Sequence, residues 1–259
     1  MTVRRLNRIF AEDGRAVIVA LDHGLLDGPC EGFEHPGETI AAVVAGGADA
    51  ILTSFGIAEA FATELSRVGL ILRSDGASTN LGSPSTGSLS SFFGAEDAAR
   101  LGADALVVTA LPGSDKEDQT LETLARTVAD AHQWGIPVLG EMVPGGFNSS
   151  AELRSPEAVA FAARLGAELG ADFIKAPYCD DYETVTGSTF VPVVILGGSK
   201  GDEAAMLGNI RNAIDAGAKG VAIGRNVFQC ENPTAMTQAI VAVVHEDATV
   251  DQALALLAG

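Results

Sequence analysis

Four segments of the chain repeat one pattern of small, polar and apolar residues. Each begins with a glycine after an alanine-rich stretch, at Gly46, Gly102, Gly170 and Gly217, and continues into an apolar run. A glycine at the end of a helical pattern is a typical helix C-cap, and a short apolar run bounded by small residues is typical of a buried strand. The repeat therefore predicts four helix-to-strand junctions.

Four more apolar runs alternate with these copies along the chain. They cover residues 16–21, 70–72, 136–139 and 191–196. Strands are therefore expected near residues 17, 50, 70, 105, 137, 172, 193 and 220. Helical patterns separate most of them, for example at 117–132, 156–169 and 202–216, and residues 232–257 are expected to form a closing helix and an extra one.

Eight strand–helix units with fully apolar strands are typical of one architecture. The chain of 259 residues has the length of an α/β fold of the (β/α)8 TIM barrel type, and no linker divides it, so we predict a single barrel domain over residues 1–259. A doubly wound open sheet is the alternative, but the glycine-rich fingerprint after its first strand is absent, and Leu21-Asp22-His23-Gly24 stands there. Residues 75–93 predict a long loop or a weak helix. Trp134, at a helix end, is expected in the core.

Composition narrows the classes of function. The net charge of −18 argues against a nucleic-acid partner, because binding to phosphates needs a basic surface. The cysteines Cys30, Cys179 and Cys230 are far apart and lack metal-binding spacing, so neither a disulfide framework nor a metal site is expected. The chain has no apolar run long enough to cross a membrane and no signal-peptide pattern at its start, so we expect a cytoplasmic protein without a membrane partner.

Ionisable residues gather where the predicted strands end, although only 19% of the chain is charged. In a (β/α)8 barrel the active site lies at the C-terminal ends of the strands, and only closure of the barrel brings those ends together. The residues there are Asp22, His23, Arg73, Asp75, Glu141, Lys175, Lys200 and Arg225. We therefore predict an active site built from this set.

Lys175 ends the apolar segment 171–176, where a core strand has no structural use for a charge. Burial disfavours the charged ammonium, and a neutral amine can attack a carbonyl carbon to form a Schiff base. The alternative is a lysine whose amine reaches solvent at a strand end. Across the barrel mouth, Asp22 can pair with the amine or hold a proton, and His23 can orient a hydroxyl or move protons near neutral pH. Glu141 and Tyr178 are further acid–base candidates.

Two glycine-rich loops predict a phosphate site. Glycines let the backbone approach an anion, and many barrels of this type bind phosphate after their seventh and eighth strands. The residues concerned are Gly197, Gly198, Ser199, Lys200, Gly224 and Arg225. The alternative is a set of turn glycines beside a surface arginine. Arg73 and Asp75 are expected to contact the distal end of the substrate.

Four motifs stand in one order between residue 17 and about residue 233: the segments 21–24, 171–175, 193–200 and 220–229. In these motifs the chain resembles the class I aldolases of the archaeal fructose-bisphosphate aldolase type. Their relatives include 2-amino-3,7-dideoxy-D-threo-hept-6-ulosonate synthase and the thiolase that acts on phosphorylated autoinducer-2. The resemblance implies that Lys175 is the Schiff-base lysine, that Asp22 assists proton transfers, and that the loops at Gly198 and Arg225 hold the substrate phosphate. It also implies a homo-oligomer, a pentamer or a decamer of stacked pentamers, and no metal or other cofactor, because the iminium polarises the substrate.

One position departs from the family. The aldolases carry an acid–base tyrosine before a proline after the fifth strand, and here Val143 precedes Pro144. Either Glu141, Tyr178 or His23 takes over the proton transfer, or the reaction is no longer the cleavage of a sugar bisphosphate.

We therefore predict a class I aldolase, a lyase, for a phosphorylated ketose-like substrate, with dihydroxyacetone phosphate or a similar fragment as the enamine half. The alternatives are thiolase-like acyl transfer on a phosphorylated diketone, and a barrel that binds a phosphorylated ligand without turnover.

Overall fold

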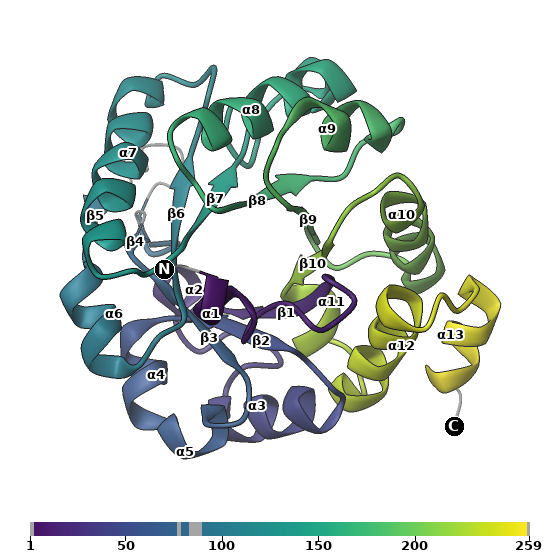
Figure 1. Cartoon of the computed structure of the whole chain (residues 1–259). Helices are drawn as coiled ribbons and strands as arrows, with labels where there is room; N and C mark the ends of the chain where they lie inside the picture. Colours follow the sequence, from purple (N-terminus) through teal and green to yellow (C-terminus); the bar gives the residue numbers. More distant parts are fainter. Residues whose placement is uncertain (1–2, 77–78, 83–89, 258–259) are drawn as a thin grey trace.

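Eight parallel strands close into a barrel in the computed structural model, and helices surround it (Figure 1). The structure describes residues 3–76, 79–82 and 90–257. Around the barrel the strands follow the order β1-β10-β9-β8-β7-β6-β3-β2. They are β1 (Ala16–Leu21), β2 (Ala50–Thr53), β3 (Gly69–Arg73), β6 (Ala105–Ala110), β7 (Val138–Met142), β8 (Phe173–Pro177), β9 (Val193–Leu196) and β10 (Gly220–Ile223). The predicted (β/α)8 barrel and the positions of its eight strands are confirmed.

Helices precede the first strand, occupy connections between strands and follow the last strand. They are α1 (Val3–Leu6), α2 (Gly24–Asp27), α3 (Pro36–Ala45), α4 (Phe55–Ala60), α5 (Ala62–Leu65), α6 (Ala95–Leu101), α7 (Glu117–Gln133), the 3-10 helix η2 (Ala151–Arg154), α8 (Pro156–Glu168), α9 (Tyr182–Ser188), α10 (Glu203–Asp215), α11 (Arg225–Phe228), α12 (Pro233–His245) and α13 (Val250–Leu257). The helical patterns expected at 117–132, 156–169, 202–216 and 232–257 are thus confirmed. Within the described ranges, no helix combines the length and the apolar character needed to cross a membrane.

The segment 75–93, expected to be a loop or a weak helix, begins and ends in short strands. β4 (Asp75–Gly76) and β5 (Ser90–Ser91) pair in antiparallel fashion. Residues 77–78 and 83–89 of this segment lie outside the described residues. The pairing of Asp75 with Ser91 ties the chain just beyond β3 to the segment that precedes α6.

The repeated glycine pattern does more than end four helices. Its glycines adopt left-handed φ values of 72° to 93°, which other residues rarely adopt, at Gly47, Gly102, Gly170 and Gly217. In three copies the aspartate that follows accepts a hydrogen bond from a backbone N–H at the start of the neighbouring strand. The pairs are Asp49 with Val17 at 2.6 Å, Asp104 with Leu70 at 3.0 Å and Asp172 with Val138 at 2.8 Å. The repeat therefore also satisfies backbone groups at the N-terminal end of the barrel.

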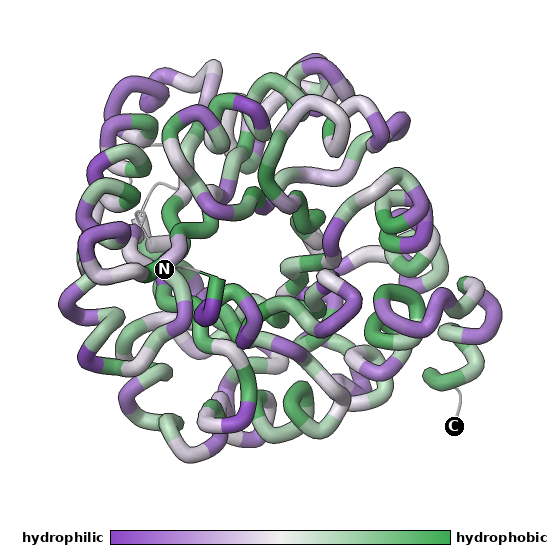
Figure 2. Tube along the Cα trace, viewed as in Figure 1, coloured by the Kyte–Doolittle hydropathy of each residue, from purple (hydrophilic) through white to green (hydrophobic). Residues whose placement is uncertain are grey.

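Apolar side chains close that end of the barrel interior. Ile9 is fully buried among the inward-facing residues of the strands, and Leu6 and Phe10 pack against the same cluster. The ring of Phe10 meets that of Phe173 edge-on, with centroids 5.4 Å apart. Figure 2 shows hydrophobic residues along the strands and hydrophilic ones on the outer turns of the helices. The polar side chains of the interior are thus left at the opposite, C-terminal end.

Two predictions from the sequence concern the cysteines and the single tryptophan. The three cysteines are free, as expected. The prediction that Trp134 lies in the core is wrong, because 52% of this residue is exposed. It is the C-cap of α7, and Gly135 directly after it has a φ of 63°, so the side chain stands at a turn where the chain reverses toward β7.

Candidate active site

The polar residues at the C-terminal end of the barrel continue the inward-facing rows of the strands. Thr109 of β6, Glu141 of β7 and Lys175 of β8 are paired in register across three adjacent strands. Because side chains alternate along a strand, these three point inward with the apolar residues that lie two positions earlier. Those earlier residues, Val107, Leu139 and Phe173, belong to the apolar interior. Strand alternation thus places a hydroxyl, a carboxylate and an amine in one layer.

Lys175 is buried, and its amine has a carboxylate partner. Only 5% of the residue is exposed, so its amine does not simply reach solvent. Its Nζ lies 2.7 Å from Oε1 of Glu141. A buried ammonium group needs such a partner to offset its lost hydration. The structure therefore holds Lys175 as one half of an ion pair.

Arg73 occupies the same layer and contacts three carboxylates. Its Nε donates to Oδ2 of Asp22 at 2.8 Å, its Nη1 to Oδ1 of Asp75 at 3.1 Å and its Nη2 to Oε2 of Glu141 at 2.8 Å. Nη1 also donates to the hydroxyl of Thr109 at 2.9 Å. These four contacts use four of the five N–H donors of a guanidinium group.

Thr109 completes the network with two further hydrogen bonds. Its hydroxyl donates to Oε2 of Glu141 at 2.8 Å, and its backbone N–H donates to Oδ2 of Asp75 at 2.9 Å. Glu141 therefore accepts from Arg73 and Thr109 through one oxygen and meets Lys175 through the other. Arg73, Thr109 and Glu141 each contact at least two other members of the network, which fixes their orientation.

The three carboxylates differ in pKa and in exposure. Burial opposes the ionisation of Glu141, but Lys175 and Arg73 outweigh it and hold the pKa of Glu141 well below its usual range. Burial likewise opposes the ionisation of Asp22, whose pKa is nevertheless lowered, chiefly by Arg73. Burial dominates at Asp75 and raises its pKa. The side chain of Asp22 is 13% exposed, against 4% for Glu141 and 1% for Asp75, so Asp22 is the carboxylate most open to a substrate.

His23 lies between this network and the loop after β10. Its Nδ1 is 3.6 Å from Oδ1 of Asp22, and its ring packs edge-on against Phe228 with centroids 5.1 Å apart. Burial lowers the pKa of His23, although Asp22 opposes this effect. A Cβ on Gly224 would come within 2.5 Å of Cε1 of His23, so glycine is needed there for the ring to take its place.

The two glycine-rich loops after β9 and β10 are tied together by Asn226. Its Nδ2 donates to the carbonyl oxygens of Gly197 at 2.9 Å and Ser199 at 3.2 Å. Its Oδ1 accepts from the backbone N–H of Gly201 at 3.0 Å. The amine of Lys200 donates to the carbonyl of Gln229, just after α11.

Arg225 starts α11, and its Nε is buried without a hydrogen-bond partner among the described residues. The loops predicted to hold phosphate therefore form one connected unit.

The structure brings most of the predicted site residues together and sets one candidate apart. Tyr178 stacks on Tyr182 with ring centroids 5.8 Å apart, and its hydroxyl accepts from Nδ2 of Asn212, on α10, at 3.5 Å. Sequence reasoning did not include Thr109, and it placed Asn226 at the end of the eighth strand without giving it a role. Thr109 did leave a signal, because it is a polar residue at an inward position of an otherwise apolar strand. The role of Asn226 could not be predicted, since it depends on carbonyl groups of another loop.

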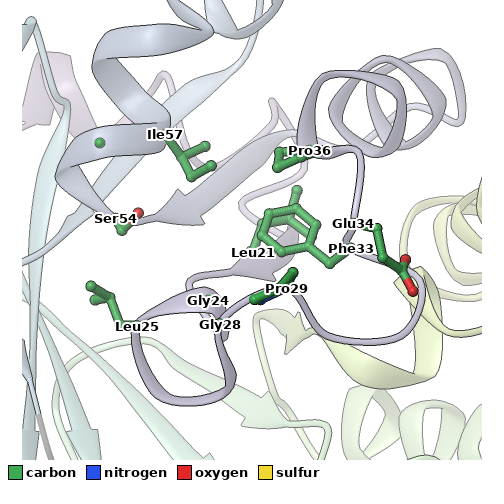
Figure 3. A pocket seen from close by; sticks show the side chains of 11 residues that line it. Leu21, Gly24, Leu25, Gly28, Pro29, Phe33, Glu34, Pro36, Ser54 and Ile57 are labelled. Atoms are coloured by element: carbon green, nitrogen blue, oxygen red, sulfur yellow. The ribbon is translucent and has the colours of Figure 1, made fainter. Parts of the chain in front are cut away.

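An apolar cavity of about 350 Å³ lies near these strand ends, between the connection that follows β1 and the start of α4 (Figure 3). Leu21, Phe33 and Ile57 contribute to its apolar wall, and Glu34 and Ser54 add polar groups. Leu21 belongs to the outer apolar cluster, between strands and helices. The charged layer of Lys175 and Arg73 does not line this cavity.

Comparison with known proteins agrees with the geometry. The family model described as DeoC/LacD family aldolase matches residues 16–230. The 2-amino-3,7-dideoxy-D-threo-hept-6-ulosonate synthase of Halobacterium salinarum is 40% identical over 254 residues, which cover 97% of this chain and 94% of that protein.

Solved structures agree as well. An archaeal fructose 1,6-bisphosphate aldolase matches with a TM-score of 0.83 and 33% identity, over 95% of this chain and 100% of that one. An archaeal fructose-1,6-bisphosphate aldolase whose catalytic lysine is covalently bound to the carbinolamine intermediate of its substrate matches with a TM-score of 0.82 and 32% identity, over 94% of this chain and 99% of that one. The chain therefore belongs to the DeoC/LacD family of aldolases, and it is a lyase of the Schiff-base-forming, class I type.

Proposed function

We propose that Lys175 is the residue that forms the Schiff base and that the substrate is a phosphorylated, ketose-like compound. Dihydroxyacetone phosphate, or a similar ketone phosphate, is the half that stays on the enzyme as the enamine. The observation that carries this proposal is the buried amine of Lys175 at the C-terminal end of β8, 2.7 Å from Glu141 and in one hydrogen-bonded network with Asp22. The names of the relatives support the class of substrate.

Formation of the iminium leaves the charge of this site unchanged. The Nζ of Lys175 gives up protons and adds its electron pair to the ketone carbon, while the carbonyl oxygen takes up two protons and leaves as water. The ammonium and the iminium both carry one positive charge at this nitrogen. The carboxylate of Glu141 therefore faces a cation before and after the bond forms.

Cleavage then needs a base for the hydroxyl proton of the carbon beyond the bond that breaks. The electron pair of the broken carbon–carbon bond flows into the iminium, which becomes a neutral enamine, and an aldehyde leaves. Asp22 is the group that we assign to this proton transfer, because it is ionised and is the most exposed of the three carboxylates. Protonation of the enamine carbon and addition of water release the ketone phosphate and Lys175. His23, next to Asp22, is placed to orient a substrate hydroxyl.

The phosphate of the substrate is assigned to the loops after β9 and β10. Gly197, Gly198 and Ser199 supply backbone there, and Lys200 and Arg225 supply positive charge. Gly224 lets the backbone and the ring of His23 approach closely. The unpartnered Nε of Arg225 supports this assignment, because a buried donor of this kind is costly to leave unpaired.

Reductive trapping tests the proposal. The protein is incubated with dihydroxyacetone phosphate, reduced with borohydride and digested, and the peptides are analysed by mass spectrometry, with the Lys175→Met variant as control. We expect one adduct, on the peptide that contains Lys175, and none in the variant. An unmodified Lys175 with every ketone phosphate tried would contradict the proposal.

Acyl transfer remains the second candidate, because Val143 stands where the aldolases carry a tyrosine. Val143 is fully buried and offers no proton. In this reading coenzyme A accepts the fragment that an aldolase releases as an aldehyde. Formation of a coenzyme A thioester from a phosphorylated diketone supports acyl transfer, and release of a free aldehyde from a ketose phosphate supports the aldolase.

The homo-oligomer implied by the resemblance stays a prediction. Light scattering coupled to size-exclusion chromatography separates a pentamer or decamer from a monomer.

A further inference from the structure

Arg73 was expected to contact the substrate, but its surroundings favour another role. The residue is 8% exposed, and protein groups already occupy four of its N–H donors. An arginine that binds a phosphate in bidentate fashion presents two free N–H groups on one edge. Arg73 has one N–H left, so it lacks that edge.

Arg73 binds one carboxylate oxygen of Glu141 and one of Asp22, and the second oxygen of each carboxylate is left for other contacts. Glu141 turns Oε2 to Arg73 and so presents Oε1 to Lys175 at 2.7 Å. Asp22 turns Oδ2 to Arg73, and its Oδ1 is 3.6 Å from Nδ1 of His23, beyond hydrogen-bond distance. The guanidinium thus fixes the rotation of both carboxylates while leaving one oxygen of each for the reaction.

The charged groups around these carboxylates come from four strands, β1, β3, β7 and β8, and from α11. Asp22 and His23 follow β1, Arg73 and Asp75 lie at and after the end of β3, Glu141 is in β7 and Lys175 in β8, and Arg225 acts on His23 from α11. Three carboxylates therefore face the two basic side chains Arg73 and Lys175. Removal of Arg73 would leave three carboxylates around Lys175 alone, so protons would bind to Asp22 and Glu141 more readily.

We propose that Arg73 is a positioning residue of the aldolase reaction and not a ligand of the substrate phosphate. It holds Glu141 as the fixed counter-ion of Lys175, in both the ammonium and the iminium state, and it leaves Asp22 as the carboxylate that exchanges protons with the substrate. This inference rests on the proposed function, because it assigns supporting roles around the Schiff-base lysine. A counter-ion that never changes its protonation suits a nitrogen whose charge is the same before and after the iminium forms.

The test measures the rate at which the enzyme forms the enamine from dihydroxyacetone phosphate. This measurement does not require that the aldehyde substrate be known. Exchange of hydrogen for deuterium at the hydroxymethyl carbon of dihydroxyacetone phosphate is recorded by NMR between about pH 4 and pH 9. Wild type is compared with Arg73→Met, Arg73→Lys and Arg225→Met. Arg211→Met is the matched control, because Arg211 also pairs with two carboxylates, Asp215 and Asp247, but does so on the outer layer.

For Arg73→Met we expect the acid limb of the exchange rate to move up by at least about one pH unit and the rate at neutral pH to fall about 100-fold. The KM for dihydroxyacetone phosphate should change less than about threefold, since Arg73 makes no contact with the phosphate. For Arg225→Met the KM should rise about tenfold with the acid limb in place. Arg73→Lys keeps the positive charge but lacks the forked N–H groups of the guanidinium. Its acid limb should therefore lie close to that of the wild type. Arg211→Met should leave both readouts unchanged.

Three results separate the possible failures. A KM that rises about tenfold in Arg73→Met, with an unmoved acid limb, makes Arg73 a substrate ligand and overturns the inference alone. If Arg73→Met does not fold, Arg73→Lys is measured in its place. A raised KM for dihydroxyacetone phosphate at an unchanged exchange rate in that variant also makes Arg73 a substrate ligand and overturns the inference. If wild-type Lys175 forms no borohydride-trapped adduct, the proposed function fails and the inference falls with it.

Discussion

Replacement of Glu141 by glutamine tests the buried ion pair with a nearly isosteric change. The carboxylate accepts from three groups: Nζ of Lys175 at 2.7 Å, Nη2 of Arg73 at 2.8 Å and the hydroxyl of Thr109 at 2.8 Å. The glutamine amide keeps one acceptor oxygen, and its NH2 group is a donor. In either orientation of the amide, one of the two cations then faces a donor in place of an acceptor.

The size of the effect follows from the geometry. Two unit charges 2.7 Å apart attract each other by about 6 kcal/mol at an effective dielectric constant of about 20, before the loss of hydration is counted. Breaking one side of a buried pair costs about 3 to 5 kcal/mol in proteins, because the remaining charge stays buried and uncompensated. We expect Glu141→Gln to lower the free energy of unfolding by about that amount. If half of it is also lost from the iminium state, the rate of enamine formation falls by about 30-fold.

Urea unfolding and deuterium exchange into dihydroxyacetone phosphate measure the two effects on one preparation. Asp104→Asn is the matched control, because Asp104 is a buried partner of Arg8 at 2.9 Å at the opposite end of the barrel. The control should lose stability and keep its exchange rate. The reasoning is refuted if Glu141→Gln retains the wild-type exchange rate within about threefold, since the carboxylate would then contribute no charge to the reacting nitrogen.

Two further predictions concern the phosphate loops and the pH dependence of stability. Asn226→Ala removes the hydrogen bonds that join the loops after β9 and β10. We therefore expect the KM for dihydroxyacetone phosphate to rise about tenfold with a smaller change in kcat. An unchanged KM would show that Asn226 does not contribute to substrate binding. The hydrogen bond from His245 to Asp49 at 3.0 Å, together with that to Asp13 at 2.8 Å, raises the pKa of His245 above its ordinary value. The stability that these hydrogen bonds contribute is therefore fully present below about pH 6.5 and is lost as the pH rises through the raised pKa of His245. The urea midpoints of wild type and His245→Gln, plotted against pH, should converge at high pH. Midpoints that differ by the same amount at every pH would contradict this.

Sequence reasoning succeeded where a local pattern had one physical solution. Lys175 and Asp22 could be assigned to one site because each follows an apolar strand, and a closed barrel brings all strand ends to one rim. It failed for Trp134, since the apolar character of a side chain does not show which way it points at a helix end. It left the role of Arg73 open between two functions, because the chemistry of a guanidinium group fits substrate binding as well as it fits the pairing of buried carboxylates.

The sequence by itself determined the eight strands, their order along the chain and the residue types at their C-terminal ends. The hydrophobic periodicity, the turn glycines and the apolar runs are local properties of the sequence, and they decide its secondary structure. Because the strands form a closed barrel, they also decide that the polar residues lie at the C-terminal ends of the strands. Only the tertiary structure decided which polar group meets which. Arg73 and Glu141 lie 68 positions apart and Asp22 lies 51 positions before Arg73, so their contacts depend on closure and register of the barrel. Register also places Glu141 beside Lys175 in one inward-facing layer, because the two residues are paired across β7 and β8.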